Sequence, residues 1–286
     1  MPNFRIHYEE EEHEEADYDK FFNKKSIGFR TQNSSYFKSI ISFISNIIET
    51  ANIKLTKDGL KILSMDKAHI GLIDCFLPKT FFKLYNNTND DKSETVIGIN
   101  LVSLNKILNH IKVEDDLIFE YKEDTLDISF INAKYKKFYT LKLMDIDCDE
   151  LNIFDCENIT GINIESKYFS EIIHDFTDIG ENVKISISKD RIDDENQNIS
   201  LECSGDMTGI QMILCNDDLT LSNLQDINLE FSLKNFQTFA KGANLNKYMN
   251  IDINQNYPIK LSYQIMNTGH INYFIAPRIS DDDDEY

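Results

Sequence analysis

The stretch SYFKSII at residues 35–41 recurs in the second half of the chain as KYFSEII at residues 167–173. A second pair of similar segments, SLNKIL at 103–108 and SLKNFQ at 232–237, lies at nearly the same spacing. Offsets of 132 and 129 residues in two independent segments indicate an internal duplication. The sequence therefore predicts two similar domains in tandem, each with two helices.

The four repeated segments have the periodicity of amphipathic helices, which we expect over residues 34–49, 103–112, 166–177 and 232–242. Their apolar residues recur every three or four positions, as in Phe37, Ile40, Ile41 and Ile44. A serine stands near the start of each segment, where its hydroxyl would accept a hydrogen bond from a free backbone N–H. The expected N-caps are Ser34 or Ser35, Ser103, Ser166 and Ser232.

Most of the remaining chain alternates between apolar and polar residues, which is typical of half-buried strands. Ile53 and Leu55 precede a hairpin turn at residues 57–59, and Leu60 and Ile62 follow it. Four short helices among many antiparallel strands indicate an α+β fold, in which the helices cover one face of the sheets.

The composition limits the possible functions. The chain has 286 residues, 41% of them hydrophobic, which is enough for two domains with buried cores. Its 49 acidic and 29 basic residues give a formal net charge of −20, so any role on DNA must depend on a local basic patch. No apolar run reaches the roughly 18 residues of a membrane span, and the five cysteines form no CxxC pair. We expect a soluble intracellular protein with no membrane partner, no metal and no cofactor.

Two strongly acidic segments flank the predicted domains. Residues 1–25 hold eight acidic residues against four basic ones, and residues 281–286 form a second acidic run. Like charges with few apolar anchors are typical of solvated, flexible chain. We therefore expect a flexible N-terminal arm and an acidic C-terminal tail.

The four predicted helices are basic although the chain is acidic. They hold six lysines against three acidic residues, a net charge of +3. A chance scatter of lysines on solvated faces explains this composition equally well, but all four helices share the pattern within the repeat. Such a face can approach DNA phosphates without repulsion and with little base readout.

Three further stretches resemble the proliferating cell nuclear antigen (PCNA) family of sliding clamps for DNA polymerases. They are LSMDKAHIGL at 63–72, LKLMDID at 141–147 and GHINYFIAPRI at 269–279. GINL at 98–101 fits the same family, and the match runs in order from about residue 28 to 280. The abundance of Asn, Ile and Lys indicates an AT-rich genome, such as that of a large DNA virus or a protist.

The resemblance implies a homotrimeric ring that encircles duplex DNA without regard to sequence, a processivity factor with no enzymatic activity. Its clamp domains would span residues 26–144 and 161–280, joined by a connector over 145–160. Edge strands near residues 135–143 and 208–215 would pair between subunits. The partners would be DNA polymerase, a clamp loader and other replication and repair proteins, at replication sites in the nucleus or, for a virus, in the host cell.

The resemblance also implies two sets of site residues. The DNA-facing set is Lys38, Lys106, Lys112, His174, Lys234 and Lys241. On the front of the ring, an apolar pocket under the connector would take a short partner motif with a glutamine and a pair of aromatic residues. The partner-pocket set is Met65, His69, Ile70, Leu72, Leu151, Ile153, Pro258, Phe274, Ala276 and Pro277.

Two other functions stay open. Asp145, Asp147 and Asp149 alternate along an extended segment and could hold Mg²⁺ for nuclease or phosphotransfer chemistry. A solvated connector is favoured, because no base or nucleophile accompanies them and the chain has no GxxxxGK[ST], HExxH, GxSxG or GxGxxG motif. Alternatively, the chain acts as an acidic DNA mimic or a chaperone of basic proteins, which would need its acids on an ordered face and not in tails.

Overall fold

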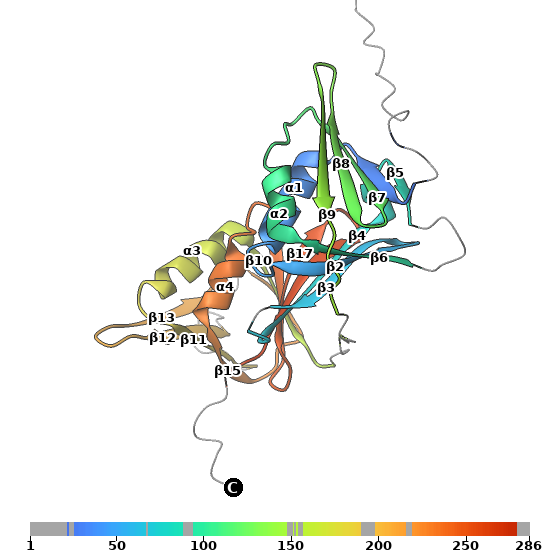
Figure 1. Cartoon of the computed structure of the whole chain (residues 1–286). Helices are drawn as coiled ribbons and strands as arrows, with labels where there is room; N and C mark the ends of the chain where they lie inside the picture. Colours follow the sequence, from blue (N-terminus) through green and yellow to red (C-terminus); the bar gives the residue numbers. More distant parts are fainter. Residues whose placement is uncertain are drawn as a thin grey trace, which may run out of the picture.

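The computed structural model describes residues 22, 26–66, 68–87, 94–147, 151, 153, 157–189, 198–215 and 219–278. Within these residues the chain forms four α-helices and three antiparallel sheets (Figure 1). The helices are α1 (Ser34–Ile44), α2 (Leu101–Leu108), α3 (Ser166–Thr177) and α4 (Leu233–Ala240), and a short 3₁₀ turn covers Lys79–Phe81. The predicted α+β class with two tandem domains is confirmed. No helix in the part of the chain that the structure describes is long and apolar enough to cross a membrane.

A nine-stranded sheet joins the two halves of the chain. The second half contributes β14 (Thr220–Ser222), β10 (Thr160–Glu165), β16 (Tyr248–Ile253), β17 (Ile259–Ile265) and β18 (Gly269–Ile275). The first half continues the sheet with β4 (Gly71–Pro78), β3 (Gly59–Met65), β2 (Thr50–Thr56) and β6 (Glu94–Asn100). The junction is the antiparallel pair β4–β18, so the two halves share one sheet.

Each half also has a smaller sheet of its own. The five-stranded sheet of the first half has the order β5 (Leu84–Asn86), β1 (Gly28–Thr31), β7 (Asp116–Lys122), β8 (Thr125–Ile131) and β9 (Lys136–Lys142). The four-stranded sheet of the second half has the order β13 (Gly209–Leu214), β12 (Ile199–Ser204), β11 (Asn182–Ile187) and β15 (Ile227–Ser232). Among the described residues β9 and β13 lie at sheet edges, within the two segments predicted to be edge strands.

The helices overlap the predicted segments, but three of the four have different ends. α3 has the predicted bounds, whereas α1 ends at Ile44 and not at residue 49. Beyond Ile44 the backbone makes tighter turns, because the N–H of Ile47 donates to the Ile44 carbonyl at 2.9 Å, and β2 then begins at Thr50. α2 runs from Leu101 to Leu108 and is displaced toward the N-terminus, and α4 is shorter than expected at both ends.

The prediction of serine N-caps is wrong for α1, α2 and α3. Among the described residues one helix has a side-chain N-cap: Asn100 accepts a hydrogen bond from the N–H of Ser103 at 2.7 Å. Ser34 and Ser166 are buried first residues of their helices, so small size at a crowded helix start explains them better than capping. Ser232 occupies the N-cap position of α4 without a side-chain bond.

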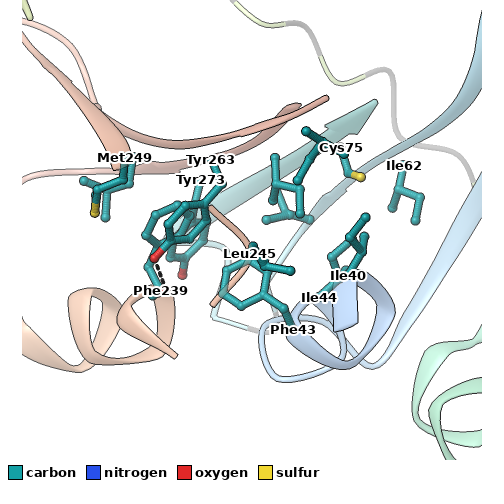
Figure 2. Close-up of a cluster of buried hydrophobic side chains, with 14 of the residues drawn as sticks. Ile40, Phe43, Ile44, Ile62, Cys75, Phe239, Leu245, Met249, Tyr263 and Tyr273 are labelled. Carbon is teal, nitrogen blue, oxygen red and sulfur yellow. Dashed lines mark hydrogen bonds between the residues drawn. The ribbon is translucent and has the colours of Figure 1, made fainter. Parts of the chain in front are cut away.

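The hydrophobic core is continuous between the two halves. Figure 2 shows the junction, where Phe43 of α1 lies edge-on to Phe239 of α4 with ring centroids 5.5 Å apart. Phe239 also stacks on Tyr263 of β17 at 4.5 Å, and the Tyr263 hydroxyl donates to the Phe239 carbonyl at 3.2 Å. Because α1 and α4 share this core, the helices of the two halves are fixed relative to each other.

Candidate functional site

Two helix pairs carry the predicted DNA-facing residues. α1 packs against α2, and α3 packs against α4 (Figure 1). The predicted apolar stripes are buried, as for Phe37, Ile40 and Ile41 of α1, which are all 0% exposed. Since the apolar stripes face the core, the polar residues of the helices lie on the opposite, solvent-facing side.

The predicted DNA-facing residues lie on this polar side. Lys106, Lys112, His174, Lys234 and Lys241 are exposed, and Lys38 is half-buried. The Lys38 ammonium lies 3.5 Å from the carbonyl oxygen of Asn109, which caps the C-terminal end of α2. A cation is favoured there by the helix dipole, so Lys38 links the two helices of the first pair.

α3 is the least basic of the four helices. His174 lies on an exposed surface with its Nδ1 3.8 Å from a carboxylate oxygen of Asp178. The same helix has the exposed acidic residues Glu171 and Asp175 besides Lys167. Acidic residues thus outnumber the lysine on this part of the surface.

Lys137 joins the basic surface, although it is not among the residues predicted to face DNA. Its ammonium donates to the His110 carbonyl at 3.2 Å, beside the end of α2, and lies 4.4 Å from the ring centroid of Tyr135. Lys112 lies over the same ring at 5.6 Å. The period-two alternation of residues 135–143 contained this signal, because it places alternate side chains of β9 on the side that faces α2.

A small polar network holds the Tyr135 ring in place. The Tyr135 hydroxyl donates to Asp115 at 2.8 Å, and the Asn132 amide donates to the same carboxylate. Desolvation and the adjacent Asp115 carboxylate raise the pKa of the Tyr135 phenol. The neutral ring thus serves as a platform for the two neighbouring ammonium groups.

The partner-pocket set comes from neighbouring strands of the nine-stranded sheet and from the connector. Met65 of β3 pairs with Leu72 of β4, and Leu72 pairs with Phe274 of β18. Paired residues point to the same face, so these three side chains form a row across the sheet. Next to this row the N–H of Ala276 donates to the Ile70 carbonyl at 3.3 Å. The fold thus brings together residues from distant parts of the chain.

Two hollows lie at the ends of this row. The larger has a volume of about 760 Å³, and its lining includes Met65, His69 and Leu151. The smaller has a volume of about 230 Å³, and its lining includes Ile153, Pro258 and Phe274. The other members of the set line neither hollow: Ile70, Leu72, Ala276 and Pro277. None of the ten residues is fully buried, and six of them line the two hollows.

The turn between β3 and β4 is held by Asp66. One oxygen of the Asp66 carboxylate accepts a hydrogen bond from the N–H of Ile70 at 3.0 Å, and the other accepts one from the Tyr273 hydroxyl at 3.3 Å. Gly71 follows the turn because a Cβ at this position would come within 2.5 Å of the Tyr273 ring. These contacts place the exposed Ile70 side chain beside the row.

The described residues do not support the alternative of a Mg²⁺ site at Asp145, Asp147 and Asp149. Asp145 and Asp147 are exposed, and Asp149 lies outside the described residues. Within the described ranges no three His, Cys, Asp or Glu side chains are grouped closely enough to hold a metal ion. Asp147 instead contributes to the wall of the larger hollow.

The two sheet edges present exposed apolar side chains. Phe138 of β9 is 71% exposed, and Ile213 of β13 is 37% exposed. Met207, just before β13, is also exposed. A sheet edge with apolar side chains is a template for pairing with another chain.

Comparison with known proteins points to one family. Residues 27–151 match the model of the N-terminal domain of proliferating cell nuclear antigen, and residues 152–278 match the model of its C-terminal domain. The proliferating cell nuclear antigen of Chaetomium thermophilum is 26% identical over 266 residues, which span 89% of this chain and 98% of that protein. The crystal structure of the Entamoeba histolytica protein of the same name has a TM-score of 0.79 and 21% identity, and the match covers 89% of this chain and 99% of that one.

Proposed function

The chain belongs to the proliferating cell nuclear antigen family and is a DNA sliding clamp, a processivity factor, and on that premise we propose how its parts serve this role. Three copies form a ring with duplex DNA through its centre. The ring tethers DNA polymerase and so raises the concentration of the enzyme at the primer end, and a weak contact with the clamp then suffices. The two alternatives, an acidic DNA mimic and a metal-dependent nuclease, have no support in this family.

The observation that carries the proposed ring is the match between the two sheet edges. Inside the chain, five strands of one half and four of the other form a nine-stranded sheet through β4 and β18. The two smaller sheets have five and four strands, so the five-stranded sheet of one copy and the four-stranded sheet of the next would together also give nine strands. Pairing of β9 with β13 would repeat this sheet across the subunit boundary. Such head-to-tail contacts close a ring when each copy turns through a third of a circle.

The two helix pairs of each copy would then line the hole. The four helices hold Lys38, Lys106, Lys167 and Lys234, and three more lysines lie near helix ends: Lys112, Lys137 and Lys241. Two acidic residues of α3 reduce the positive charge. A weakly basic lining contacts phosphates without reading bases, so the ring can slide.

We assign partner binding to the row of Met65, Leu72 and Phe274 and to the hollows at its ends. Ile70 and Ile153 are exposed apolar side chains beside this row, at 49% and 42% exposure. A helical turn with two aromatic residues would cover them and exclude water, which is how a few residues supply most of the energy at an interface. DNA polymerase, the clamp loader and repair proteins would use this surface in turn.

Clamps of this family are not enzymes, and we propose that this chain has no catalytic residue. Its site of action follows from the DNA that it encircles. We place it at sites of DNA replication, in the nucleus or in a viral replication site.

Release from DNA ends tests the ring directly. The labelled protein is loaded with a clamp loader onto nicked circular DNA, and the circle is then cut with a restriction enzyme. A ring should stay on the circle through gel filtration and escape from the cut DNA, unless bound proteins block both ends. Retention on cut DNA with free ends would show that the chain binds by contacts alone and would refute the proposal.

A further inference from the structure

The five-stranded sheet has two faces with different surroundings. Phe119 of β7 faces α1, because its ring lies 5.5 Å from the ring of Phe37. On neighbouring strands Arg30 pairs with both Leu84 and Ile118, so these three side chains share one face. Ile118 directly precedes Phe119 in the strand and therefore points the other way. We call the face with Arg30, Leu84 and Ile118 the outer face, since it lies away from the helices.

The outer face is covered although none of the helices in the described ranges packs on it. Ile118 and Ile131 are each 1% exposed, and they pack with Phe22, which is 4% exposed. Arg30 is also 1% exposed, and its guanidinium lies 2.6 Å from the Asp116 carboxylate. A sheet face without a second layer normally faces solvent. The burial of these side chains therefore requires a further segment of chain on top of them.

Phe22 identifies that segment. It lies six residues before the start of β1, within the N-terminal residues 1–25 that the sequence predicts to be a flexible arm. The rest of the arm lies outside the described residues. We propose that the outer face is a docking site for the chain's own N-terminal segment, with Phe22 as its apolar anchor.

The chain's own segment fits this site better than a second copy or a partner protein. Phe22 is close enough in sequence to β1 to reach the outer face, and it already occupies the apolar site. Three side chains that pack with it, Leu84, Ile118 and Ile131, are apolar, so an aromatic ring is a complementary group. The acidic residues of the arm need not enter the site.

The anchor also determines where the acidic run is held, and this second step rests on the proposed function. Asp17 and Asp19 lie five and three residues before Phe22, so an extended chain keeps them within about 18 and 11 Å of the anchor. The anchor lies on the side of the sheet opposite α1. Charges are largely screened beyond roughly 8–10 Å at physiological salt. A docked anchor therefore limits how far Asp17 and Asp19 can move around the sheet toward the helix lysines.

Limited trypsin digestion of the full chain tests the docking. Lys20, Lys24 and Lys25 flank Phe22 and are tryptic sites. A docked segment must open before it is cleaved, so the rate follows the open population. Phe22→Ala should raise the cleavage rate at these sites about tenfold or more, because the buried ring no longer holds the segment. Phe4→Ala, in the same arm, is the matched control and should leave the rate unchanged.

A conservative variant separates anchoring from a general loss of structure. Phe22→Leu keeps an apolar side chain in the site, so its cleavage rate should stay within about threefold of the wild type. Circular dichroism should show that all variants are folded at the digestion temperature. Equal cleavage rates for Phe22→Ala and the wild type would overturn the docking.

Binding to linear duplex DNA at low salt tests, independently of the digestion, whether docking holds the acidic residues of the arm away from the DNA-facing lysines. Phe22→Ala releases the acids with their charge intact and should weaken binding about threefold, whereas removal of residues 1–25 should restore wild-type affinity or better. Faster digestion with unchanged DNA affinity would leave the docking in place and refute its electrostatic role. If no form of the protein acts on DNA, the proposed function fails, and the digestion still decides the docking.

Discussion

Asp66 is a single residue that holds the β3–β4 turn beside the proposed partner pocket. Its carboxylate accepts hydrogen bonds from two N–H groups of the β3–β4 turn and from the Tyr273 hydroxyl. Asp66→Ala removes these bonds and frees the turn that carries Ile70. We expect the affinity for a peptide with a glutamine and two aromatic residues to fall about tenfold or more in isothermal titration calorimetry.

The exposed turn between β2 and β3 offers a matched control for this variant. Asp58→Ala changes the same residue type far from the row and should alter the affinity by less than about twofold. Wild-type affinity in Asp66→Ala, together with a lower melting temperature, would mean that Asp66 stabilises the fold without shaping the pocket.

Two buried tyrosines, Tyr263 and Tyr273, and the half-buried Tyr85 should make the protein sensitive to alkaline pH. Burial raises the pKa of Tyr85, Tyr263 and Tyr273 above the ordinary value of about 10. Below this pH both the folded and the unfolded chain keep these phenols neutral, and the full stability is present. Above it the unfolded chain loses protons that the folded chain retains. The free energy of unfolding should then fall by up to about 1.4 kcal/mol per pH unit for each tyrosine.

Tyr263→Phe isolates one of these groups. Urea unfolding between about pH 10 and 11 should show a smaller loss of stability per pH unit than in the wild type. At neutral pH the variant should be less stable by about 1 kcal/mol, because the hydrogen bond to the Phe239 carbonyl is lost. Tyr257→Phe, at an exposed position, should change neither quantity. An unchanged alkaline slope in Tyr263→Phe would contradict the assignment.

The surroundings of a single residue could be predicted where the sequence next to it determines them. The exposure of Lys106 and Lys234 could be predicted because both fall on the polar side of a helical period, whereas their contact with DNA was implied by the resemblance and stays a prediction. The burial of Phe22 could not be predicted, because a lone aromatic residue near an acidic run gives no sign that Ile118 and Ile131, about a hundred positions later, will bury it. The alternation along β9 groups Lys137 with Tyr139 on one face, but Lys137 was missed because the packing of β9 determines which face lies beside α2.

The N-caps of α2 and α4 show whether a side-chain hydrogen bond at the helix start stabilises the helix. Asn100→Ala removes the side-chain bond at the start of α2 and should lower the free energy of unfolding by about 1 kcal/mol in urea titrations. Ser232→Ala is the matched control, because Ser232 occupies the corresponding position of α4 without a side-chain bond. Its effect should stay within about 0.5 kcal/mol. Equal losses in the two variants would show that the Asn100 bond does not stabilise α2.

The edge of β9 should control ring assembly. Phe138→Asp places a charge where the proposed pairing with β13 buries an exposed ring, so sedimentation should change from a trimer to a monomer. The melting temperature of the monomer should change little, because Phe138 makes no part of the buried core. Val113→Asp, which is also highly exposed but lies off the edge, should remain trimeric. A trimeric Phe138→Asp would refute pairing through this edge.

Strands and helices were predictable where their own sequence determined them. The β2–β3 hairpin and the bounds of α3 follow from local periodicity, and the structure has both. The end of α1 could not be predicted, since apolar residues continue at Ile47 and Ile48 beyond the last helical turn. The backbone leaves the helix there because β2 must pair with β3 and β6, which is a tertiary requirement.

The duplication predicted two domains but not the way in which they join. The pairs between β4 and β18 connect residues nearly 200 positions apart, such as Asp74 and Asn272. Neither strand differs in composition from a strand that pairs within its own half. The shared sheet therefore became visible in the fold and not in the periodicity.

Binding of the chain to linear DNA through its lysines and retention of a closed ring on circular DNA should depend differently on salt concentration. A chain of net charge −20 with a few lysines on its helices should bind linear duplex weakly, and each phosphate contact adds about −0.9 to the slope of log affinity against log salt. For three contacts, raising salt from about 0.1 to 0.5 M should lower that affinity roughly 75-fold. A ring loaded on a closed circle is held by its own subunit contacts, so its lifetime in a fluorescence challenge assay should change less than about twofold over the same range. Phe138→Asp, which cannot close the ring, should show the salt dependence of linear DNA on both substrates. If the wild type leaves circles as quickly as linear DNA at high salt, charge alone holds it and no duplex passes through a ring.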